Sequence, residues 1–303
     1  MSSKIVVVGS LNMDLVACAS RIPIAGETIS GHTFLSQPGG KGANQAFAAG
    51  RLGAHVSMIG KVGQDDFGRR MRVNLESVGC DVSGLGTTAD CSSGIALIFV
   101  ADSGQNSIIV VPGANHRLSP RDIEDSRANF QGAAAVLLQL ETPLPTVVAA
   151  AQAAHRAGVL TILDPAPAPA QPLPAELLES TDIITPNESE AAILTGLPPG
   201  RLDVAQAFHV ASKLQTQGPR TVIVKLGDLG CALRDGKDEE LIPAPKVNAV
   251  DTTAAGDVFN AALAVALSEG SSISDACRFA NRAAALSVTR RGAQQAAPAR
   301  SEL

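Results

Sequence analysis

Short, strongly hydrophobic runs alternate along this chain with longer segments rich in alanine. The runs carry many β-branched side chains, as buried parallel strands do, and the first of them ends at Gly9. Strands that alternate with helices predict an α/β fold, in which helices cover both faces of a mostly parallel sheet and the connections are right-handed. The predicted strands are 4–8, 56–59, 134–140, 160–163, 183–185 and 221–225, and the clearest helices are 44–51, 146–156 and 205–215.

Two stretches, 15–35 and 94–111, do not follow this alternation. They are rich in Thr, Ser, Val and Ile, contain glycine turns and lack helical periodicity. Within the second stretch, 95–100 and 107–111 are predicted to form a β-hairpin around the segment 101–106. We expect both stretches to form a small antiparallel sheet attached to the main domain. Such a sheet serves either as a lid over a site or as an interface between subunits.

The segment 251–257 combines small residues with an acid at the start of a helical pattern. It reads Asp-Thr-Thr-Ala-Ala-Gly-Asp and is followed by the Ala- and Leu-rich run 258–267. Free N–H groups at a helix N-terminus bind anions, and the helix dipole favours negative charge there. With Asp257 in the first turn, the segment offers a base beside a stabiliser of developing charge, as phosphoryl transfer requires. The alternative is that the small residues only allow the helix to pack closely.

A glycine-rich segment, 39–46, opens another predicted helix. Its sequence, Gly-Gly-Lys-Gly-Ala-Asn-Gln-Ala, lets the backbone approach a ligand, while Lys41 and Asn44 offer hydrogen-bond donors. It is not a P-loop, because Gly42 stands where that motif needs Ser or Thr. Alternatively, the segment is a glycine turn with a solvated lysine.

Polar side chains follow several of the predicted strands. Asn12 and Asp14 come after the first strand, and Glu141 comes directly after the run 135–140. Open α/β sheets bind ligands at the carboxyl ends of their strands, where amides and carboxylates can hold the hydroxyls of a sugar. For Asn12 and Asp14 the alternative is a turn closed by their own side chains.

The regions after two later strands each permit two interpretations. Asn187 and Glu190 have the spacing of a capping box at a helix start, and they can also order water around a metal–nucleotide complex. The run 225–230, Lys-Leu-Gly-Asp-Leu-Gly, ends a strand in a glycine loop. That loop either lies against a nucleotide or is a plain turn.

Composition excludes several classes of protein. The 303 residues are 45% hydrophobic and 17% charged, which is ordinary for a globular protein. The net charge of −5 and the lack of Trp and Tyr argue against nucleic-acid binding, which needs basic patches and stacking aromatics. Five scattered cysteines form no C-x-x-C motif, and no apolar run reaches 18 residues. We therefore expect a soluble cytoplasmic protein without a membrane or nucleic-acid partner.

Taken together, the motifs resemble those of the ribokinase family of ATP-dependent sugar kinases. The family's N-terminal signature is matched from 39–46 through Gly53 to Gly63, and its C-terminal signature is matched at 251–257. The resemblance covers nearly the whole chain, and two long signatures at the family's spacing do not arise readily by chance. Shorter likenesses lie at 9–14, 185–188 and 289–294.

The resemblance implies one ribokinase-like α/β domain over 1–303, with a lid sheet built from segments at about 12–38 and 92–113. It implies in-line transfer of the γ-phosphoryl group of ATP to O5 of D-ribose, with Mg²⁺ and the monovalent cation K⁺ as cofactors. It also implies a homodimer that forms through the lid sheet. The alternatives are a kinase for another pentose, a hexose or a nucleoside, and a sugar sensor without activity.

The resemblance assigns roles to individual residues. Asp257 matches the general base, which also contacts the sugar, and the backbone of Ala254, Ala255 and Gly256 matches an anion hole for the transferred group. The remaining positions are the ribose ligands Asn12, Asp14, Gly40, Lys41, Asn44 and Glu141; the nucleotide ligands Asn187, Lys225, Leu226, Gly227, Asp228, Leu229, Gly230, Gly256 and Asn281; Glu190, which places Mg²⁺ through water; and the K⁺ ligands Asp251, Thr253, Ser287, Arg290 and Gly292.

Three positions depart from the family's pattern. Ala296 stands where a serine hydroxyl can approach the cation, so one K⁺ ligand is missing or is replaced by water. Lys225 and Asp228 stand where other members can carry Thr and Ser, which would alter contacts with the triphosphate. None of the three changes Asp257.

Overall fold

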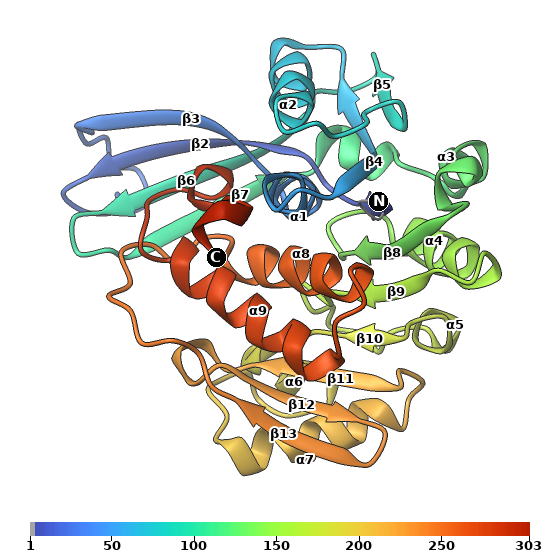
Figure 1. Ribbon diagram of the computed structural model, residues 1–303. Helices are drawn as coiled ribbons and strands as arrows, with labels where there is room; N and C mark the ends of the chain where they lie inside the picture. Colours follow the sequence, from blue (N-terminus) through green and yellow to red (C-terminus); the bar gives the residue numbers. More distant parts are fainter. Residues whose placement is uncertain (1–3) are drawn as a thin grey trace.

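A nine-stranded sheet forms the centre of the computed structural model, which describes residues 4–303 (Figure 1). Its strands are β1 (Lys4–Val8), β4 (His55–Gly63), β5 (Leu85–Thr88), β8 (Ala133–Leu138), β9 (Leu160–Leu163), β10 (Ile183–Ile184), β11 (Thr221–Lys225), β12 (Cys231–Asp235) and β13 (Asp238–Ile242). Their order across the sheet is β13, β12, β11, β10, β9, β8, β1, β4 and β5. All neighbours from β11 to β5 are parallel, whereas β12 and β13 are antiparallel to their neighbours. The prediction of a mostly parallel sheet is therefore confirmed.

Helices cover both faces of this sheet, and each face has its own hydrophobic core (Figure 1). One layer consists of α1 (Lys41–Arg51), α2 (Asp66–Glu76), α8 (Ala255–Ser268) and α9 (Ile273–Ser287). The other consists of α3 (Pro120–Asp125), α4 (Leu144–Arg156), α5 (Ala175–Glu179), α6 (Glu188–Leu194) and α7 (Val204–Gln215). In β1, Ile5 and Val7 enter the first core, and Val6 and Val8 enter the second. Because successive side chains on a strand point to opposite faces, burial on both faces requires the uninterrupted apolar run.

The centre of the sheet contains a switch in strand order. β1 lies between β4 and β8, so the chain builds one half of the sheet on one side of β1 and the other half on the opposite side. Connections diverge at such a point, and a ligand crevice opens at the carboxyl ends of the strands. Ser10 follows β1 and Glu141 follows β8, so the topology brings these two polar residues to the same crevice.

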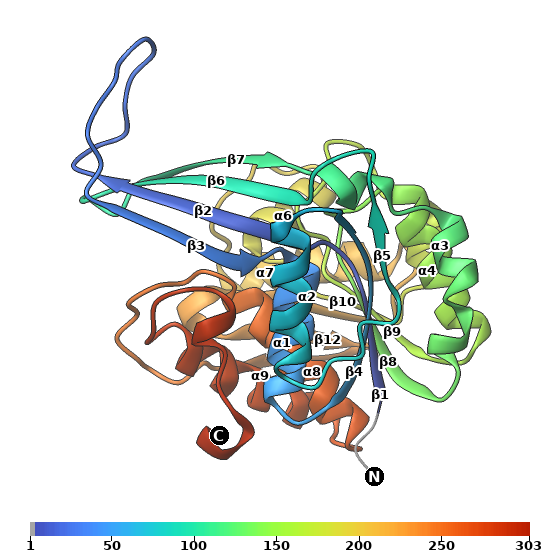
Figure 2. The ribbon, with the colours of Figure 1, turned by 90° about the horizontal axis from the view of Figure 1, so that it is seen from above.

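A second sheet of four strands, which we call the lid sheet, projects from the main body (Figure 2). Its strands, in spatial order, are β3 (Thr33–Gly39), β2 (Asn12–Ala19), β6 (Gly94–Ala101) and β7 (Asn106–Val111). The predicted hairpin is confirmed as β6 and β7. The prediction of an antiparallel sheet is wrong for the central pair, because β2 and β6 are parallel. Both strands leave the main body in the same direction and their hairpin partners return, so the strands that meet in the middle must be parallel.

Several elements were not predicted from the sequence. The helix α2 is rich in arginine and buries only Gly68, Met71 and Leu75, which gives a weak apolar stripe. The edge strand β13 exposes most of its residues and so lacks a hydrophobic run. α9 and β5 were also missed. Short 3₁₀ turns occupy Gly113–Arg117, Arg127–Phe130, Gly227–Leu229, Gln294–Ala296 and Arg300–Glu302.

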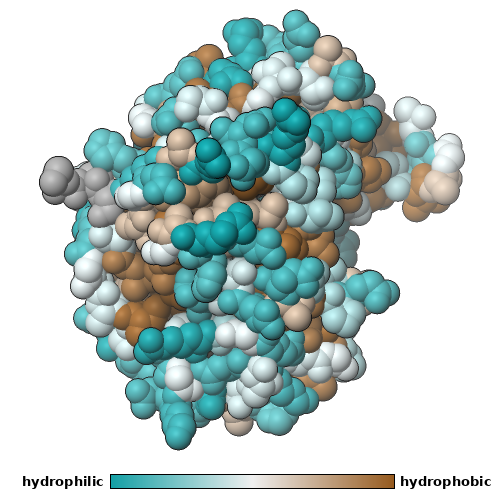
Figure 3. All heavy atoms as spheres, turned by 90° about the vertical axis from the view of Figure 1, so that its right-hand side faces the viewer, coloured by the Kyte–Doolittle hydropathy of each residue, from teal (hydrophilic) through white to brown (hydrophobic). Residues whose placement is uncertain are grey.

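The outer surface is consistent with amphipathic helices. The face on the right of Figure 1, which carries α3, α4 and α5, is mostly hydrophilic, and its hydrophobic residues gather in smaller patches (Figure 3). Within residues 4–303, no helix combines the length and the apolar character needed to cross a membrane.

Candidate active site

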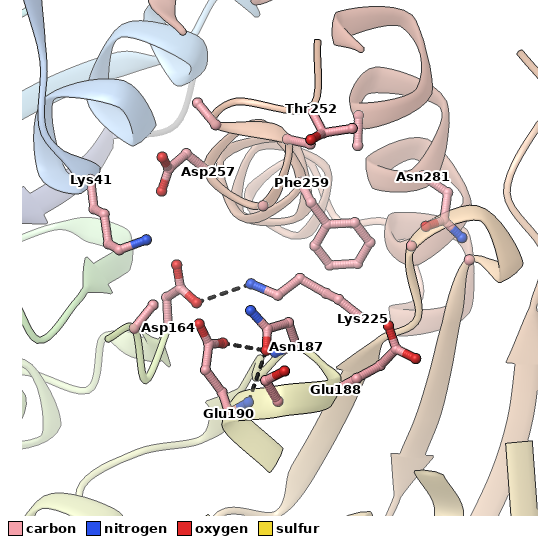
Figure 4. A pocket seen from close by; sticks show the side chains of 18 residues that line it. Lys41, Asp164, Asn187, Glu188, Glu190, Lys225, Thr252, Asp257, Phe259 and Asn281 are labelled. Carbon is pink, nitrogen blue, oxygen red and sulfur yellow. Dashed lines mark hydrogen bonds and ion pairs between the residues drawn. The ribbon is translucent and has the colours of Figure 1, made fainter. Parts of the chain in front are cut away.

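A cleft of about 490 Å³ opens at the carboxyl ends of β9, β10 and β11, beside the N-terminus of α8 (Figure 4). It brings together parts of the chain that are far apart in sequence, including Lys41 of the glycine-rich segment and residues of the segment 251–257. The residues that line it are Lys41, Asp164, Ala166, Asn187, Glu188, Ser189, Glu190, Lys225, Gly227, Gly230, Thr252, Ala254, Ala255, Gly256, Asp257, Phe259, Asn281 and Ala284.

The start of α8 presents free backbone donors to this cleft. Ala254, the residue before the helix, has a left-handed conformation with φ 59° and makes no capping hydrogen bond through its side chain. The amide of Ala255 donates weakly to the carbonyl of Thr252, at 3.3 Å. Among the described residues, the N–H groups of Gly256 and Asp257 have no hydrogen-bond acceptor. Unpaired N–H groups at the positive end of a helix are suited to hold an anion.

Asp257 is buried at the edge of this cleft and is held by two amide side chains. Its Oδ2 accepts a hydrogen bond from Asn44 Nδ2 at 2.9 Å, and its Oδ1 accepts one from Gln45 Nε2 at 3.1 Å. Burial raises the pKa of Asp257 to about 6; nearby Lys41 opposes the rise, and the charge of Asp164 adds to it. A carboxylate with a pKa near neutrality is suited to accept a proton.

The predicted sugar ligands cluster on the β1–β8 side of Asp257. Glu141 Oε2 accepts hydrogen bonds from Ser10 Oγ at 2.5 Å and from the Lys41 amide at 3.1 Å. The pKa of Asp14 is raised to about 7 by its burial and by the neighbouring charges of Glu141 and Asp257. Hydroxyl donors of a ligand would relieve this repulsion between carboxylates, which makes the cluster a suitable site for a polyol.

Close packing of backbone explains the glycine before α1. Gly40 has φ 89°, and a β-carbon built on it would lie 2.7 Å from the amide nitrogen of Asn12. The Asn12 side chain is itself fixed, because its Oδ1 accepts a hydrogen bond from Asn115 Nδ2 at 2.8 Å. Only glycine combines this conformation with this approach, so the start of α1 can lie directly against the residues after β1.

Lys41 is the cation of the sugar side, and its side chain points into the cleft (Figure 4). Burial favours its neutral form. The negative charges of Asp257, Asp164, Glu141 and Glu190 outweigh burial and raise the pKa of Lys41 further above its ordinary value. Lys41 therefore stays charged in a site with an excess of carboxylates.

The predicted nucleotide residues form the opposite wall. Asn187 and Glu190 make a complete capping box at the start of α6, in which Glu190 Oε2 accepts from the Asn187 amide at 2.8 Å. The two interpretations of this pair are compatible, because both residues also line the cleft. Burial raises the pKa of Glu190, with Lys225 opposing and Asp164 adding to the rise.

The loop after β11 and the helix α9 complete this wall. Gly227, Gly230 and Lys225 line the cleft, as does Asn281, whose Nδ2 donates to the carbonyl of Ile242 at 2.9 Å. Asp228 and Leu229 are exposed on the loop outside the lining. The side chain of Leu226 lies in the second core, so this residue can offer a ligand only its backbone.

The predicted cation ligands lie together beyond the anion site. Asp251 accepts hydrogen bonds from the amides of Thr253 and Gly292, both at 2.9 Å. Burial alone would raise the pKa of Asp251. The two backbone bonds, together with a bond from the Thr253 hydroxyl, outweigh burial and lower this pKa below its ordinary value. The backbone amide of Arg290 donates a hydrogen bond to the carbonyl of Ser287, which links these two predicted ligands.

Several residues of the site were missed by sequence reasoning. Asp164 lies between the two walls of the cleft, Gln45 bridges it to Asp257, and Gln139 holds the Gln45 side chain. Asp164 follows β9 directly, in the same position relative to its strand as other site residues, and that placement was the available signal. The aromatic ring of Phe259 also faces the cleft (Figure 4).

Comparisons with known proteins find similar sequences and a similar fold among carbohydrate kinases. Residues 2–300 match the family described as pfkB family carbohydrate kinase. A ribokinase from Haemophilus influenzae is 42% identical over 302 residues, covering 100% of this chain and 97% of that protein. A deoxyribokinase from Salmonella typhi is 38% identical over 295 residues, covering 97% of this chain and 95% of that protein. The structure of Arabidopsis thaliana ribokinase complexed with ribose and ATP superimposes with a TM-score of 0.92 at 38% identity, covering 99% of this chain and 97% of that one.

Proposed function

This chain belongs to the pfkB family of carbohydrate kinases, and we propose that it transfers the γ-phosphoryl group of ATP to O5 of D-ribose. One observation carries the proposal: the Asp257 carboxylate stands in the first turn of α8, at the bare N-terminus of the helix, and its charge reaches the buried carboxylate of Asp14. The names of the relatives support ribose as the sugar, because the full-length relative from Haemophilus influenzae is a ribokinase and the Arabidopsis structure holds ribose and ATP.

The mechanism follows from the positions of these groups. Ribose binds beneath the lid sheet, and its hydroxyls donate hydrogen bonds to Asp14 and Glu141. Asp257 takes the proton of the O5 hydroxyl while the bond between O5 and the γ-phosphorus forms and the bond to the leaving ADP oxygen breaks. The free N–H groups at the start of α8 stabilise negative charge on the phosphoryl oxygens. Positioning and electrostatics supply the catalysis, and no covalent enzyme intermediate is needed.

The lid sheet has a separate task in this scheme. It extends from β2 and β3, whose ends nearest the main body carry Asn12, Asp14 and Gly39. A movement of the sheet would therefore act directly on the sugar-binding residues. Closure over bound ribose would exclude water, which would otherwise accept the phosphoryl group.

Sugar specificity is the test of the proposed substrate. We expect kcat/KM to be at least about tenfold higher for D-ribose than for 2-deoxyribose, fructose or adenosine, because a site that hydrogen-bonds each hydroxyl rejects an analogue that lacks one. Initial rates of ADP formation with each sugar provide the measurement. A preference for 2-deoxyribose would instead assign the chain the activity named for its Salmonella typhi relative, and phosphorylation of none of these compounds would contradict the proposal.

Mg²⁺ is proposed to bind with ATP, near Glu190. Glu190 Oε2 is used by the capping box, but no described residue donates to its Oε1, and the side chain faces the cleft. This carboxylate would help to hold a hydrated Mg²⁺ that arrives with the nucleotide. The ion would neutralise phosphate charge when bound.

K⁺ is proposed to bind beside the anion site, and the residues present fit it. Among residues 4–303, no hydrogen bond reaches the carbonyl oxygens of Thr253, Arg290 or Gly292, which leaves these acceptors for a cation. K⁺ is commonly held by backbone carbonyls. Ala296 is buried and has no oxygen in its side chain, so it contributes no ligand there.

This proposal predicts activation by a monovalent cation. Replacing K⁺ by tetramethylammonium at constant ionic strength should lower kcat several-fold, because the organic ion is too large for a site of converging carbonyls. The Asp251→Asn variant should respond less steeply to K⁺, since the charge that attracts the ion is removed. A kcat that is indifferent to the cation would rule the site out.

A homodimer through the lid sheet is also proposed. The lid sheet exposes Phe34, Leu35, Ile108 and Ile109, whose exposed fractions are between 49% and 66%. β7 exposes all six of its residues and forms an open edge of the sheet. Apolar surface on an open edge favours association with a second copy. The cytoplasmic location expected from the sequence stays a prediction.

The oligomeric state checks this interface. We expect sedimentation velocity to give a dimer for the wild-type protein and a monomer for Ile109→Asp, because a buried carboxylate without a partner opposes association. Val73→Asp is the matched control, since Val73 is exposed on α2, outside the lid sheet. A wild-type protein that stays monomeric at micromolar concentration, or a control that dissociates equally, would contradict the proposed interface.

A further inference from the structure

Both oxygens of the Asp257 carboxylate are held by amide side chains of α1, and each of these amides is in turn bound by a glutamine. Asn44 donates to one oxygen and Gln45 to the other. The two glutamines are Gln139, which directly follows β8, and Gln294, which begins a 3₁₀ turn after α9. Both are buried, and neither is among the residues that line the cleft. The proposed mechanism gives these two glutamines no role.

An amide side chain can hold a carboxylate in only one of its two orientations. Its nitrogen donates hydrogen bonds, whereas its oxygen only accepts them and would repel the negative charge. Half a turn of the amide exchanges the two atoms with little change of shape, so close packing alone does not select the correct orientation. A donor bound to the amide oxygen does select it, because the oxygen is then fixed on the side away from the carboxylate.

Gln139 provides such a donor for Gln45. Gln139 Nε2 donates to Gln45 Oε1 at 2.6 Å, so the Gln45 nitrogen faces the carboxylates of Asp257 and Asp164, each at 3.1 Å. The other oxygen of Asp164 accepts a hydrogen bond from Lys225 Nζ at 3.0 Å, which fixes this carboxylate as well. Asp164 and Asp257 lie at the same end of the cleft (Figure 4). A reversed Gln45 amide would place its oxygen against both carboxylates at once.

The space around Gln139 is specific to this side chain. A β-carbon built on Gly9 would collide with Gln139 Oε1, so the glycine after β1 makes room for the amide. That oxygen has no hydrogen-bond partner among residues 4–303, and leaving a buried polar atom unpaired costs free energy. Within the same range, the bond to Gln45 is the one hydrogen bond of the Gln139 side chain. Its contacts therefore fit a role in orienting Gln45 better than a role in stability.

Gln294 makes the corresponding contact on the other side of the base. Its Nε2 donates to Asn44 Oδ1 at 3.1 Å, and its own oxygen accepts from Asn74 Nδ2, on α2, at 2.5 Å. The Asn44 nitrogen is thereby turned toward Asp257 Oδ2, to which it donates at 2.9 Å. Three amides in series, from α2 through the turn after α9 to α1, end on the carboxylate.

We propose that Gln139 and Gln294 are positioning residues, each of which orients one amide of α1 so that Asp257 is held in a single, charged arrangement. The inference rests on the proposed function for the role of Asp257 as the base, but not on the identity of the sugar. The bonds from Asn44 and Gln45 lower the pKa of Asp257 against the rise caused by burial. Loss of either orientation should therefore raise this pKa and allow the carboxylate to turn.

Carbon-13 NMR tests the inference on the protein without sugar or nucleotide. With aspartate labelled at the side-chain carboxyl carbon, the signal of Asp257 is the one that is missing from Asp257→Asn, and its pH titration gives the pKa. The wild-type value is expected at about 6. Gln139→Met and Gln294→Met should each raise it by roughly 0.5–1 pH unit, because each weakens one hydrogen bond to a charged group.

Gln215→Met is the matched control. Gln215, on α7, also makes two side-chain hydrogen bonds, to Arg220 and Arg234, but it lies outside the lining of the cleft. Its replacement removes a comparable amount of hydrogen bonding and should leave the pKa of Asp257 at the wild-type value.

Kinetics separate positioning from a general loss of structure. At about pH 8.5 the base is ionised in all variants, so a remaining loss of rate reports misalignment. There, Gln139→Met should lower kcat about tenfold and change the KM for the sugar less than about twofold. Gln294→Met should also raise this KM, because Asn44 is a predicted ligand of the sugar. In both variants kcat/KM should begin to fall at a higher pH than in the wild type.

A double-mutant cycle shows whether Gln139 acts through Gln45. Gln45→Met alone should raise the pKa of Asp257 at least as much as Gln139→Met, and combining the two should have little further effect. If Gln139→Met does not fold because Gln45 Oε1 is left unpaired, the double variant removes both partners, and Gln294→Met tests the same arrangement at the other oxygen of the base.

The inference is overturned for either glutamine whose replacement leaves the pKa of Asp257 near 6. It is overturned for both if Gln215→Met shifts this pKa equally, and for Gln139 if the cycle is fully additive. A wild-type protein that phosphorylates no sugar would contradict the proposed function instead. The NMR titration would still decide whether the two glutamines orient Asp257, because it requires no turnover.

Discussion

Replacing Asp257 by Asn should lower kcat about 10²–10⁴-fold while leaving the affinity for ribose largely intact. The new side chain has the same shape but cannot accept the proton of the O5 hydroxyl. It also presents an amide nitrogen to Asn44 or Gln45, both of which donate to the carboxylate in the wild type, so part of the loss comes from disturbed positioning. Steady-state kinetics give kcat, and calorimetry with ribose in the absence of ATP gives the affinity.

Asp238→Asn is the matched control, because Asp238 is an exposed carboxylate on the edge strand β13. It should leave kcat and ribose binding unchanged. Near-normal turnover in Asp257→Asn would remove Asp257 from the role of base and with it the proposed mechanism.

The pH dependence gives an independent check on the same residue. Burial raises the pKa of Asp257 to about 6, and only the ionised form can accept a proton, so kcat/KM should fall as the pH decreases through about 6. Asp14, with a pKa raised to about 7, contributes a second ionisation in the same direction. The residual activity of Asp257→Asn should lose the dependence near 6, and the dependence from Asp14 should move to lower pH, because the charge of Asp257 no longer raises the pKa of Asp14.

Replacing Lys41 by Met should lower kcat/KM about 10²–10³-fold, the scale of losing one preorganised group that stabilises developing charge. Lys41 is the cation nearest the sugar side, and its charge offsets those of Asp257, Asp164 and Glu141. Without it, the phosphates of ATP would approach a cleft dominated by carboxylates. Kinetics with ribose and ATP varied separately provide the measurement.

The pH at which kcat/KM falls separates the electrostatic role of Lys41 from a purely structural one. The positive charge of Lys41 lowers the pKa of Asp257, so Lys41→Met should move the fall in kcat/KM to higher pH. Lys213→Met, an exposed lysine on α7, should change neither the rate nor its pH dependence. A large loss of rate with no change in the pH at which kcat/KM falls would indicate that Lys41 acts by shape rather than by charge.

The regular elements were predictable where one periodicity dominated. β1, β9 and β11 have the predicted bounds, because strands buried on both faces are uninterrupted apolar runs. Amphipathic elements were harder to predict, since α2 buries only three of its residues and β13 exposes most of its residues. The lid sheet was recognised as β structure, but its central parallel pair was not, because pairing direction depends on how the chain enters and leaves the sheet.

The glycine-rich segment 39–46 and the segment 251–257 could be identified from sequence because they act through backbone shape, which small residues alone permit. The resemblance to a kinase family rested on these segments. Asn187 and Glu190 show the limit of such reasoning: a capping box and a ligand site require the same residues, and the structure contains the capping box at the edge of the cleft.

The sequence by itself determined the α/β class, the glycine-rich segment 39–46 and the small-residue segment 251–257 with its acid at Asp257, because these depend on residue type and on neighbours along the chain. Only the tertiary structure decided which charges meet. Asp164 and Lys225 are 61 positions apart, and Gln45 reaches Asp257 across 212 positions. Their contacts depend on the strand order around β1, which brings the carboxyl ends of distant strands to one crevice, and no local pattern contains that information.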